Sequence, residues 1–139
     1  MRRGMLAGAV AAAVWAAAEP ALGRAFGTSY SDVRLLSGVT GRSTAGALAI
    51  HLANGAVFGA VFERLGGCGV VRGVLAAQVE NVALWPLMAV VDRIHPERRS
   101  GNWPPLLDNR RIFAYEATAH ALFGAVLGSL VSPSRAQLR

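Results

Sequence analysis

The sequence is poor in charge and in cysteine, and it contains no lysine. Only 16% of its 139 residues are charged, whereas a soluble domain usually carries about 25%. The single cysteine, Cys68, excludes a disulfide framework and a zinc site built from cysteines. All 14 basic residues are arginines, but they form no stripe with interleaved aromatic side chains, which argues against nucleic-acid binding. The sequence also has no phosphate-binding loop and no serine-hydrolase or zinc-hydrolase motif, so an enzymatic role is not favoured and no catalytic residue is predicted.

What the sequence has instead is apolar residues, which make up 53% of the chain and exclude a disordered protein. Charged residues are confined to a few stretches, and the gaps between them are long enough to cross a bilayer as helices. We therefore predict an all-α fold, an integral membrane four-helix bundle that forms a single membrane domain over residues 1–139. The predicted helices cover residues 4–23, 43–62, 73–91 and 112–131. The alternative, a soluble alanine-rich bundle, would need charged outer faces that these segments do not have.

The beginning of the chain has a second interpretation. Arg2 and Arg3 precede an apolar stretch that ends in alanines, as in a signal peptide, so cleavage of residues 1–18 is an open alternative. If the first helix is kept, an even number of crossings places both termini on one side. Arginines are nearly balanced between the two sides, but two of them precede the first helix. We accordingly expect the cell (inner) membrane, with cytoplasmic termini.

The second and fourth predicted helices share a pattern. Residues 51–59 align with residues 120–128 at a histidine, two glycines and an Ala-Val pair, which predicts two tandem helical hairpins related by a parallel 2+2 repeat. Small residues four apart form a flat strip against which another helix can pack closely. These strips contain Gly55, Gly59, Gly124 and Gly128. We expect them to pack within the chain; packing against a second copy is the alternative.

Several polar residues lie inside the predicted helices, where ionisable groups are costly and need an explanation. They are Glu19, His51, Asn54, Glu80, Asn81, Glu116 and His120. Three hypotheses compete for this polar cluster. The groups could bind a metal ion, as in carboxylate-bridged bundles, although Glu116 and His120 are four apart rather than three. They could relay protons or ions, or they could simply form hydrogen bonds between helices.

Outside the helices, two predictions concern the third loop and its flanks. Four arginines there, Arg98, Arg99, Arg110 and Arg111, are candidates for binding lipid phosphates or another anion, the alternative being ordinary solvated charges. Trp103 is expected at the level of the lipid headgroups.

The predicted function is that of a small structural or accessory membrane unit. Its expected partners are the lipid bilayer and either a second copy or another membrane protein. The alternative is an ion-conducting, proton-conducting or metal-binding protein that uses the polar cluster. No cofactor is predicted, beyond the metal ion of that alternative.

Overall fold

The computed structural model describes residues 2–41 and 43–131, and every regular element in that part of the chain is helical. The elements are α1 (Arg2–Phe26), α2 (Asp32–Thr40), α3 (Thr44–Arg64), α4 (Val70–Leu84), the 3₁₀ turn η1 (Trp85–Leu87), α5 (Met88–Ile94), α6 (Pro96–Arg99) and α7 (Arg110–Leu130). The predicted all-α class is therefore confirmed.

Three helical segments are long and apolar enough to cross a membrane: Arg2–Phe26, Thr44–Arg64 and Val70–Ile94. They cover the first three predicted membrane segments, except that Ser43 is the N-cap that precedes the second. The third is α4, η1 and α5 in continuous succession, with the 3₁₀ turn at Pro86, whose nitrogen cannot donate a helical hydrogen bond. The fourth predicted segment is helical as α7 but is not among the three, so four membrane crossings are not established.

Two short helices occupy segments that the sequence analysis treated as loops. The longer one, α2, begins at the N-cap Ser31, whose hydroxyl accepts a hydrogen bond from the Arg34 backbone N–H. It ends at Gly41, which has a φ of 61° and so adopts the left-handed conformation that glycine tolerates best. With nine residues, α2 is too short to cross a bilayer.

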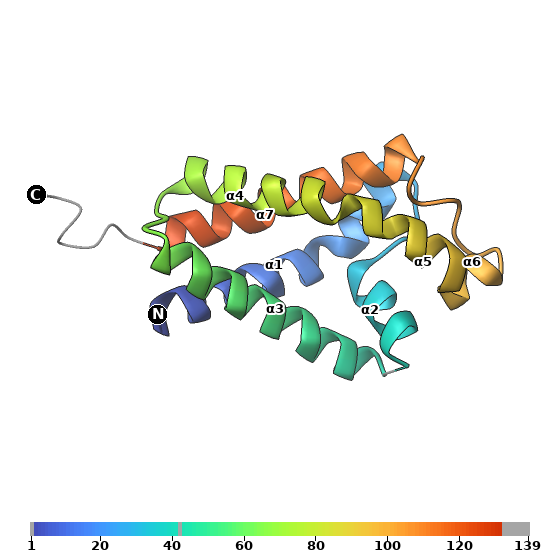
Figure 1. Ribbon diagram of the computed structural model, residues 1–139, viewed down its shortest axis with the longest axis horizontal. Helices are drawn as coiled ribbons and strands as arrows, with labels where there is room; N and C mark the ends of the chain where they lie inside the picture. Colours follow the sequence, from blue (N-terminus) through green and yellow to red (C-terminus); the bar gives the residue numbers. More distant parts are fainter. Residues whose placement is uncertain (1, 42, 132–139) are drawn as a thin grey trace, which may run out of the picture.

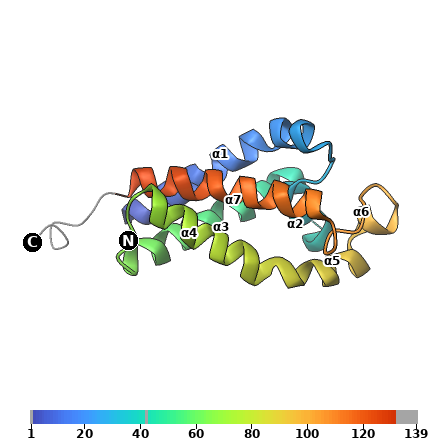
Figure 2. The ribbon, with the colours of Figure 1, turned by 90° about the horizontal axis from the view of Figure 1, so that it is seen from above.

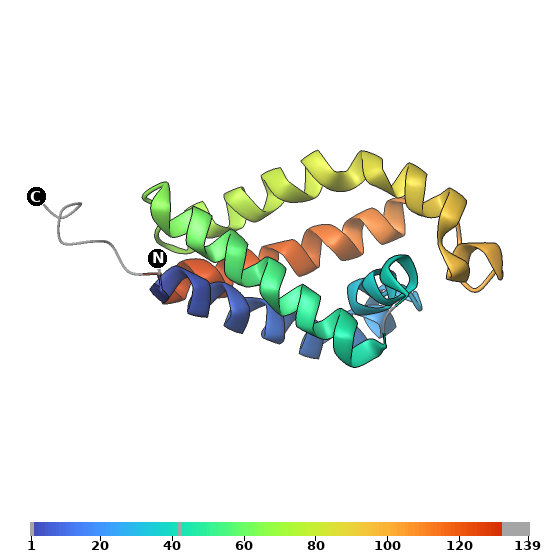
Figure 3. The ribbon, with the colours of Figure 1, turned by 60° about the horizontal axis from the view of Figure 1, so that its bottom comes forward.

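The long helices pack in the spatial order α3, α1, α7, α4, and α2 packs against α3 (Figure 1). The chain is elongated, with α6 at the end far from the N-terminus (Figure 2). From their connecting turn, α3 and α4 diverge (Figure 3). The helices form two closely packed pairs, α1 with α3 and α4 with α7, which join where α1 packs against α7.

Glycines bring the helices of each pair into backbone contact. A Cβ atom at Gly8 would lie 1.9 Å from the Gly55 carbonyl oxygen, and one at Gly59 would lie 2.1 Å from that of Gly4. In the other pair, a Cβ atom at Gly73 would lie 2.1 Å from the Gly124 carbonyl oxygen. No side chain fits at such distances, so the glycine strips are covered within the chain.

Candidate functional site

A cavity of about 280 Å³ lies between the diverging α3 and α4. Residues of α1 and α7 line the side of the cavity that faces the middle of the molecule. Residues of α2 and α5 close its end far from the N-terminus. The wall combines aliphatic and aromatic side chains with five ionisable ones. These five are Asp32, His51, Glu80, Glu116 and His120. No arginine is found among the described residues that line the cavity, although the chain has 14.

The two histidines of the sequence repeat meet at one aromatic ring. The indole of Trp15 lies edge-on to His51, with ring centroids 5.2 Å apart, and its centroid lies 4.6 Å from that of His120. Both histidines are only 8% exposed. The sequence repeat identified these two positions, but nothing in it pointed to the tryptophan between them.

Glu116 is the most deeply buried acid of the cavity wall, at 2% exposure. One carboxylate oxygen lies 3.4 Å from Nδ1 of His120, and that nitrogen also lies 2.8 Å from the Glu116 backbone oxygen. The Glu116 carboxyl group also interacts with the carboxyl group of Asp32 and the hydroxyl of Tyr30. The imidazole of His51 interacts with the backbone of Ala12, whereas Nδ2 of Asn81 has no hydrogen-bond partner among the described residues. Three helices thus each place a buried polar or ionisable side chain at the cavity wall, and such burial is costly unless the group is paired.

Asp32, at the start of α2, is a further acid that the sequence analysis did not select. Its carboxyl group neighbours that of Glu116, and its Oδ1 accepts a hydrogen bond of 3.2 Å from the hydroxyl of Tyr30. Because Asp32 lies in a polar segment between apolar helices, sequence alone gave no sign that it reaches the cavity.

Glu19 has a structural role at the edge of this region rather than a place in the cavity wall. Its carboxylate accepts a hydrogen bond of 2.7 Å from the Asp32 backbone N–H and another from the Ser31 hydroxyl. A carboxylate in this position satisfies free donors at a helix N-terminus and interacts favourably with the helix dipole. Glu19 of α1 thereby anchors the start of α2.

The remaining members of the predicted polar cluster do reach the cavity. Glu80 and Asn81 of α4 and Asn54 of α3 all line it. Among the described residues, no group of three or more His, Cys, Asp or Glu side chains is placed to hold a metal ion. The arrangement therefore gives the metal hypothesis no ligand set.

The four arginines proposed as an anion site are not a single cluster. The Arg98 side chain bonds to Asp92, with Nε 2.7 Å from Oδ1, and to the Trp103 carbonyl oxygen. Asp92 also accepts hydrogen bonds from the backbone N–H groups of Leu106 and Leu107, so this pair organises the loop. Arg110 and Arg111 border a separate open pocket, and Arg99 is exposed.

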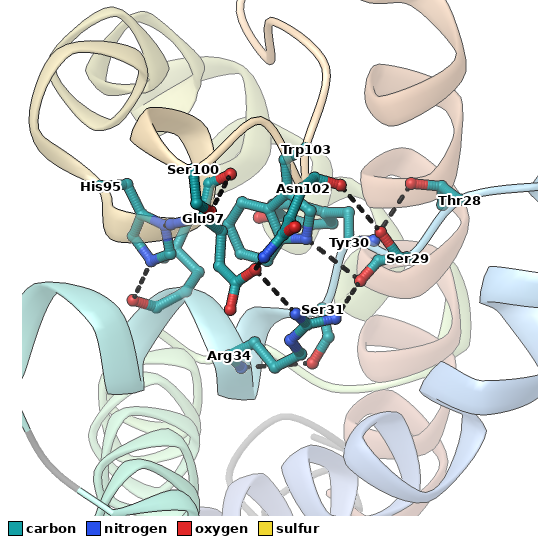
Figure 4. A network of polar contacts seen from close by, with 11 residues as sticks. Thr28, Ser29, Tyr30, Ser31, Arg34, His95, Glu97, Ser100, Asn102 and Trp103 are labelled. Carbon is teal, nitrogen blue, oxygen red and sulfur yellow. Dashed lines mark hydrogen bonds and ion pairs between the residues drawn. The ribbon is translucent and has the colours of Figure 1, made fainter.

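Trp103, which the sequence analysis expected at the level of the lipid headgroups, is packed inside the protein. It is 1% exposed and stacks on His95, with ring centroids 4.6 Å apart and planes 9° apart. Its Nε1 donates to the Ser29 carbonyl oxygen, and the Arg34 guanidinium lies over its ring (Figure 4). His95 in turn approaches the Leu35 carbonyl oxygen at 3.2 Å. This cap, formed by Ser29, Tyr30, Arg34, His95 and Trp103, holds α2 over the cavity.

The protonation of Asp32 leads to a testable pH dependence. Burial raises the pKa of its carboxyl group well above the ordinary value of 3.8, and the charges of Glu116 and Glu19 raise that pKa further, while His120 lowers it. The other titratable groups nearby are Tyr30 beside it and, across the cavity, His51 and Glu80. Above pH 3.8 the unfolded chain loses a proton that the folded chain retains. Stability should therefore fall as pH rises, by up to about 1.4 kcal/mol per pH unit for one such group.

We expect Asp32→Asn to reduce this slope in thermal unfolding of the purified protein between about pH 4 and pH 8. Asp108→Asn, which makes the same change at an exposed loop position, is the matched control and should retain the slope. Equal slopes in the Asp32 variant and the unsubstituted protein would contradict the assignment.

Comparisons of this chain with protein-family models, with curated protein sequences and with solved structures find no match.

Proposed function

We propose that the protein is a membrane-embedded binding protein whose cavity between α3 and α4 takes a small ligand. The observation that carries this proposal is the set of buried polar side chains that α3, α4 and α7 place at the wall of a mostly apolar cavity, namely His51, Asn81 and Glu116. A mostly apolar cavity with a few converging polar groups is the usual form of a small-molecule site.

A place in the membrane is supported by the outer surface as well as by the three apolar segments. On α4, the side chains that point away from the rest of the chain are large and apolar, including Val71 at 72% and Val79 at 69% exposure. Leu75 and Val82 continue the same outward face. Such a continuous exposed apolar face is unfavourable in water and is suited to lipid.

Conduction of ions or protons through the protein is less well supported than ligand binding. The polar cluster occupies the part of the helices next to α2. Toward the N-terminus of α1, the paired helices touch at glycines, and apolar side chains such as Phe62 and Leu127 are buried there. A polar path along the helices therefore ends inside the chain, which favours a binding site over a pore.

A structural role, in which the glycine strips join this chain to a partner, is the second candidate. The strips are already covered within the chain, as Gly8 with Gly55 and Gly73 with Gly124 illustrate. An accessory role would therefore have to use another surface. For this reason we favour the cavity as the working part of the molecule.

The proposal predicts saturable binding of a small aromatic probe in the cavity. Fluorescence titration of 1-aminoanthracene against the full chain in lipid nanodiscs should show one saturable component above that of empty nanodiscs. Leu36→Trp, which adds an indole to the α2 side of the cavity, should abolish this component. Val71→Trp adds the same group on the outward face of α4 and should leave it intact. Saturable binding that survives Leu36→Trp, or no saturable binding in the unsubstituted protein, would refute a cavity site.

A further inference from the structure

We infer that the ligand of this cavity is a small lipophilic organic cation, an amine or quaternary ammonium with an apolar body. This inference rests on the proposed function and names its ligand class.

The first argument is the sign of the charges at the wall. Three carboxyl groups, those of Asp32, Glu80 and Glu116, line the cavity together with two histidines, and no arginine is among its described lining residues. An anionic ligand would find no permanent positive charge there. A cation would offset the buried acids, which are costly to ionise without a partner.

The second argument is the depth of the Glu116 carboxyl group. This side chain is 2% exposed, and its polar neighbours are the Asp32 carboxyl group, the Tyr30 hydroxyl and Nδ1 of His120, which lies 3.4 Å from one of its oxygens. None of these neighbours carries a permanent positive charge. A neutral hydrocarbon in the cavity would add no interaction with the buried acid pair, whereas a cationic group would stabilise its ionised form.

The third argument is the aromatic lining. The rings of Trp15, Phe58, Trp85 and Phe123 all border the cavity. Aromatic faces attract cations, most strongly quaternary ammonium groups in a desolvated site. The aliphatic side chains of Leu35, Leu36 and Val39, all from α2, would cover an apolar body. The described residues offer an inorganic metal ion no suitable set of ligands, and such an ion would make no contact with the aliphatic side chains of α2.

The test is displacement of 1-aminoanthracene by a pair of isosteres that differ only in charge. Benzyltrimethylammonium carries a permanent positive charge, and neopentylbenzene has the same shape with carbon in place of nitrogen. In nanodiscs that hold the full chain, we expect the cation to bind at least about tenfold more tightly than its neutral isostere. The Leu36→Trp protein corrects for partition of either compound into lipid.

Two variants locate the charge that the cation recognises. Glu116→Gln and Glu80→Gln should each weaken cation binding by about tenfold and leave the neutral isostere unchanged. As a control, Asp108→Asn removes a carboxylate outside the cavity and should change neither. If Glu116→Gln no longer folds, Glu80→Gln still tests the same wall at a half-buried position.

The outcomes separate this inference from the proposed function. Equal or tighter binding of neopentylbenzene, or unchanged cation binding in both acid variants, overturns the cationic ligand while a cavity site stands. If benzylsulfonate displaces the probe more effectively than benzyltrimethylammonium and neopentylbenzene do, the ligand is an anion and the present inference is wrong. If 1-aminoanthracene shows no saturable binding to the unsubstituted protein, the proposed function itself is refuted.

Discussion

Replacing Gly8 by leucine is expected to destabilise the protein by about 3 kcal/mol or more, the upper end of the cost of overpacking. A Cβ atom there would lie 1.9 Å from the carbonyl oxygen of Gly55 and 2.8 Å from its carbonyl carbon. Because the clash is with backbone, no rotation of a side chain relieves it, and α1 and α3 must move apart. Gly124→Leu should act alike on the other pair, since its Cβ atom would lie 2.4 Å from the Gly73 carbonyl oxygen. Thermal unfolding of the purified variants measures both effects.

The matched controls place leucine on the outer faces of the same helices. Ala13 of α1 and Ala114 of α7 are exposed, so Ala13→Leu and Ala114→Leu should change the unfolding temperature little. The comparison also decides between packing within the chain and packing against a second copy. If the glycine strips served a dimer, Gly8→Leu would shift the protein to monomers of undiminished stability, which would contradict the present assignment.

Replacing Trp103 by alanine should cost about 3–5 kcal/mol, as for other large buried aromatic residues. The ring fills the cap between His95 and Tyr30, with centroids 4.6 Å and 5.0 Å away, and its N–H bonds to the Ser29 carbonyl oxygen. Without it, α2 loses its support at the end of the molecule. We therefore expect faster hydrogen exchange of the α2 amides as well as a lower unfolding temperature.

A less drastic change at the same position separates packing from hydrogen bonding. Trp103→Phe keeps an aromatic ring but loses the N–H donor, and should cost about 1 kcal/mol for the hydrogen bond in addition to a smaller loss of packing. If Trp103→Ala leaves the exchange of α2 unchanged, the cap does not hold α2. Asp32 would then depend on Glu19 alone for its position.

The helical class and most of the site residues could be predicted because they follow from local patterns. Gaps in the charge placed the long helices to within a few residues, although α7 proved less apolar than the other three. The glycine spacing identified the packing faces, and the repeat singled out His51 and His120. Both histidines do lie on the faces that meet, where they flank Trp15.

Other parts of the site could not be predicted because they depend on contacts between segments far apart in sequence. Asp32 belongs to a short polar helix, and it reaches the cavity only because Glu19 and the cap around Trp103 hold α2 there. Glu19 looked like a member of the polar cluster, yet its carboxylate serves the N-terminus of α2. The proposed arginine cluster is divided because Arg98 binds Asp92.

By itself, the sequence determined where the long helices lie, which faces are small enough to pack, and which ionisable groups lie inside apolar helices, because these properties depend on residue type and spacing along one helix. Only the tertiary structure decided that α3 and α4 diverge while α1 and α7 stay between them, which leaves a cavity. It also decided which buried polar side chains reach that cavity and which partners they have there. The partners of a buried group are atoms from other helices, and no pattern within one segment encodes them.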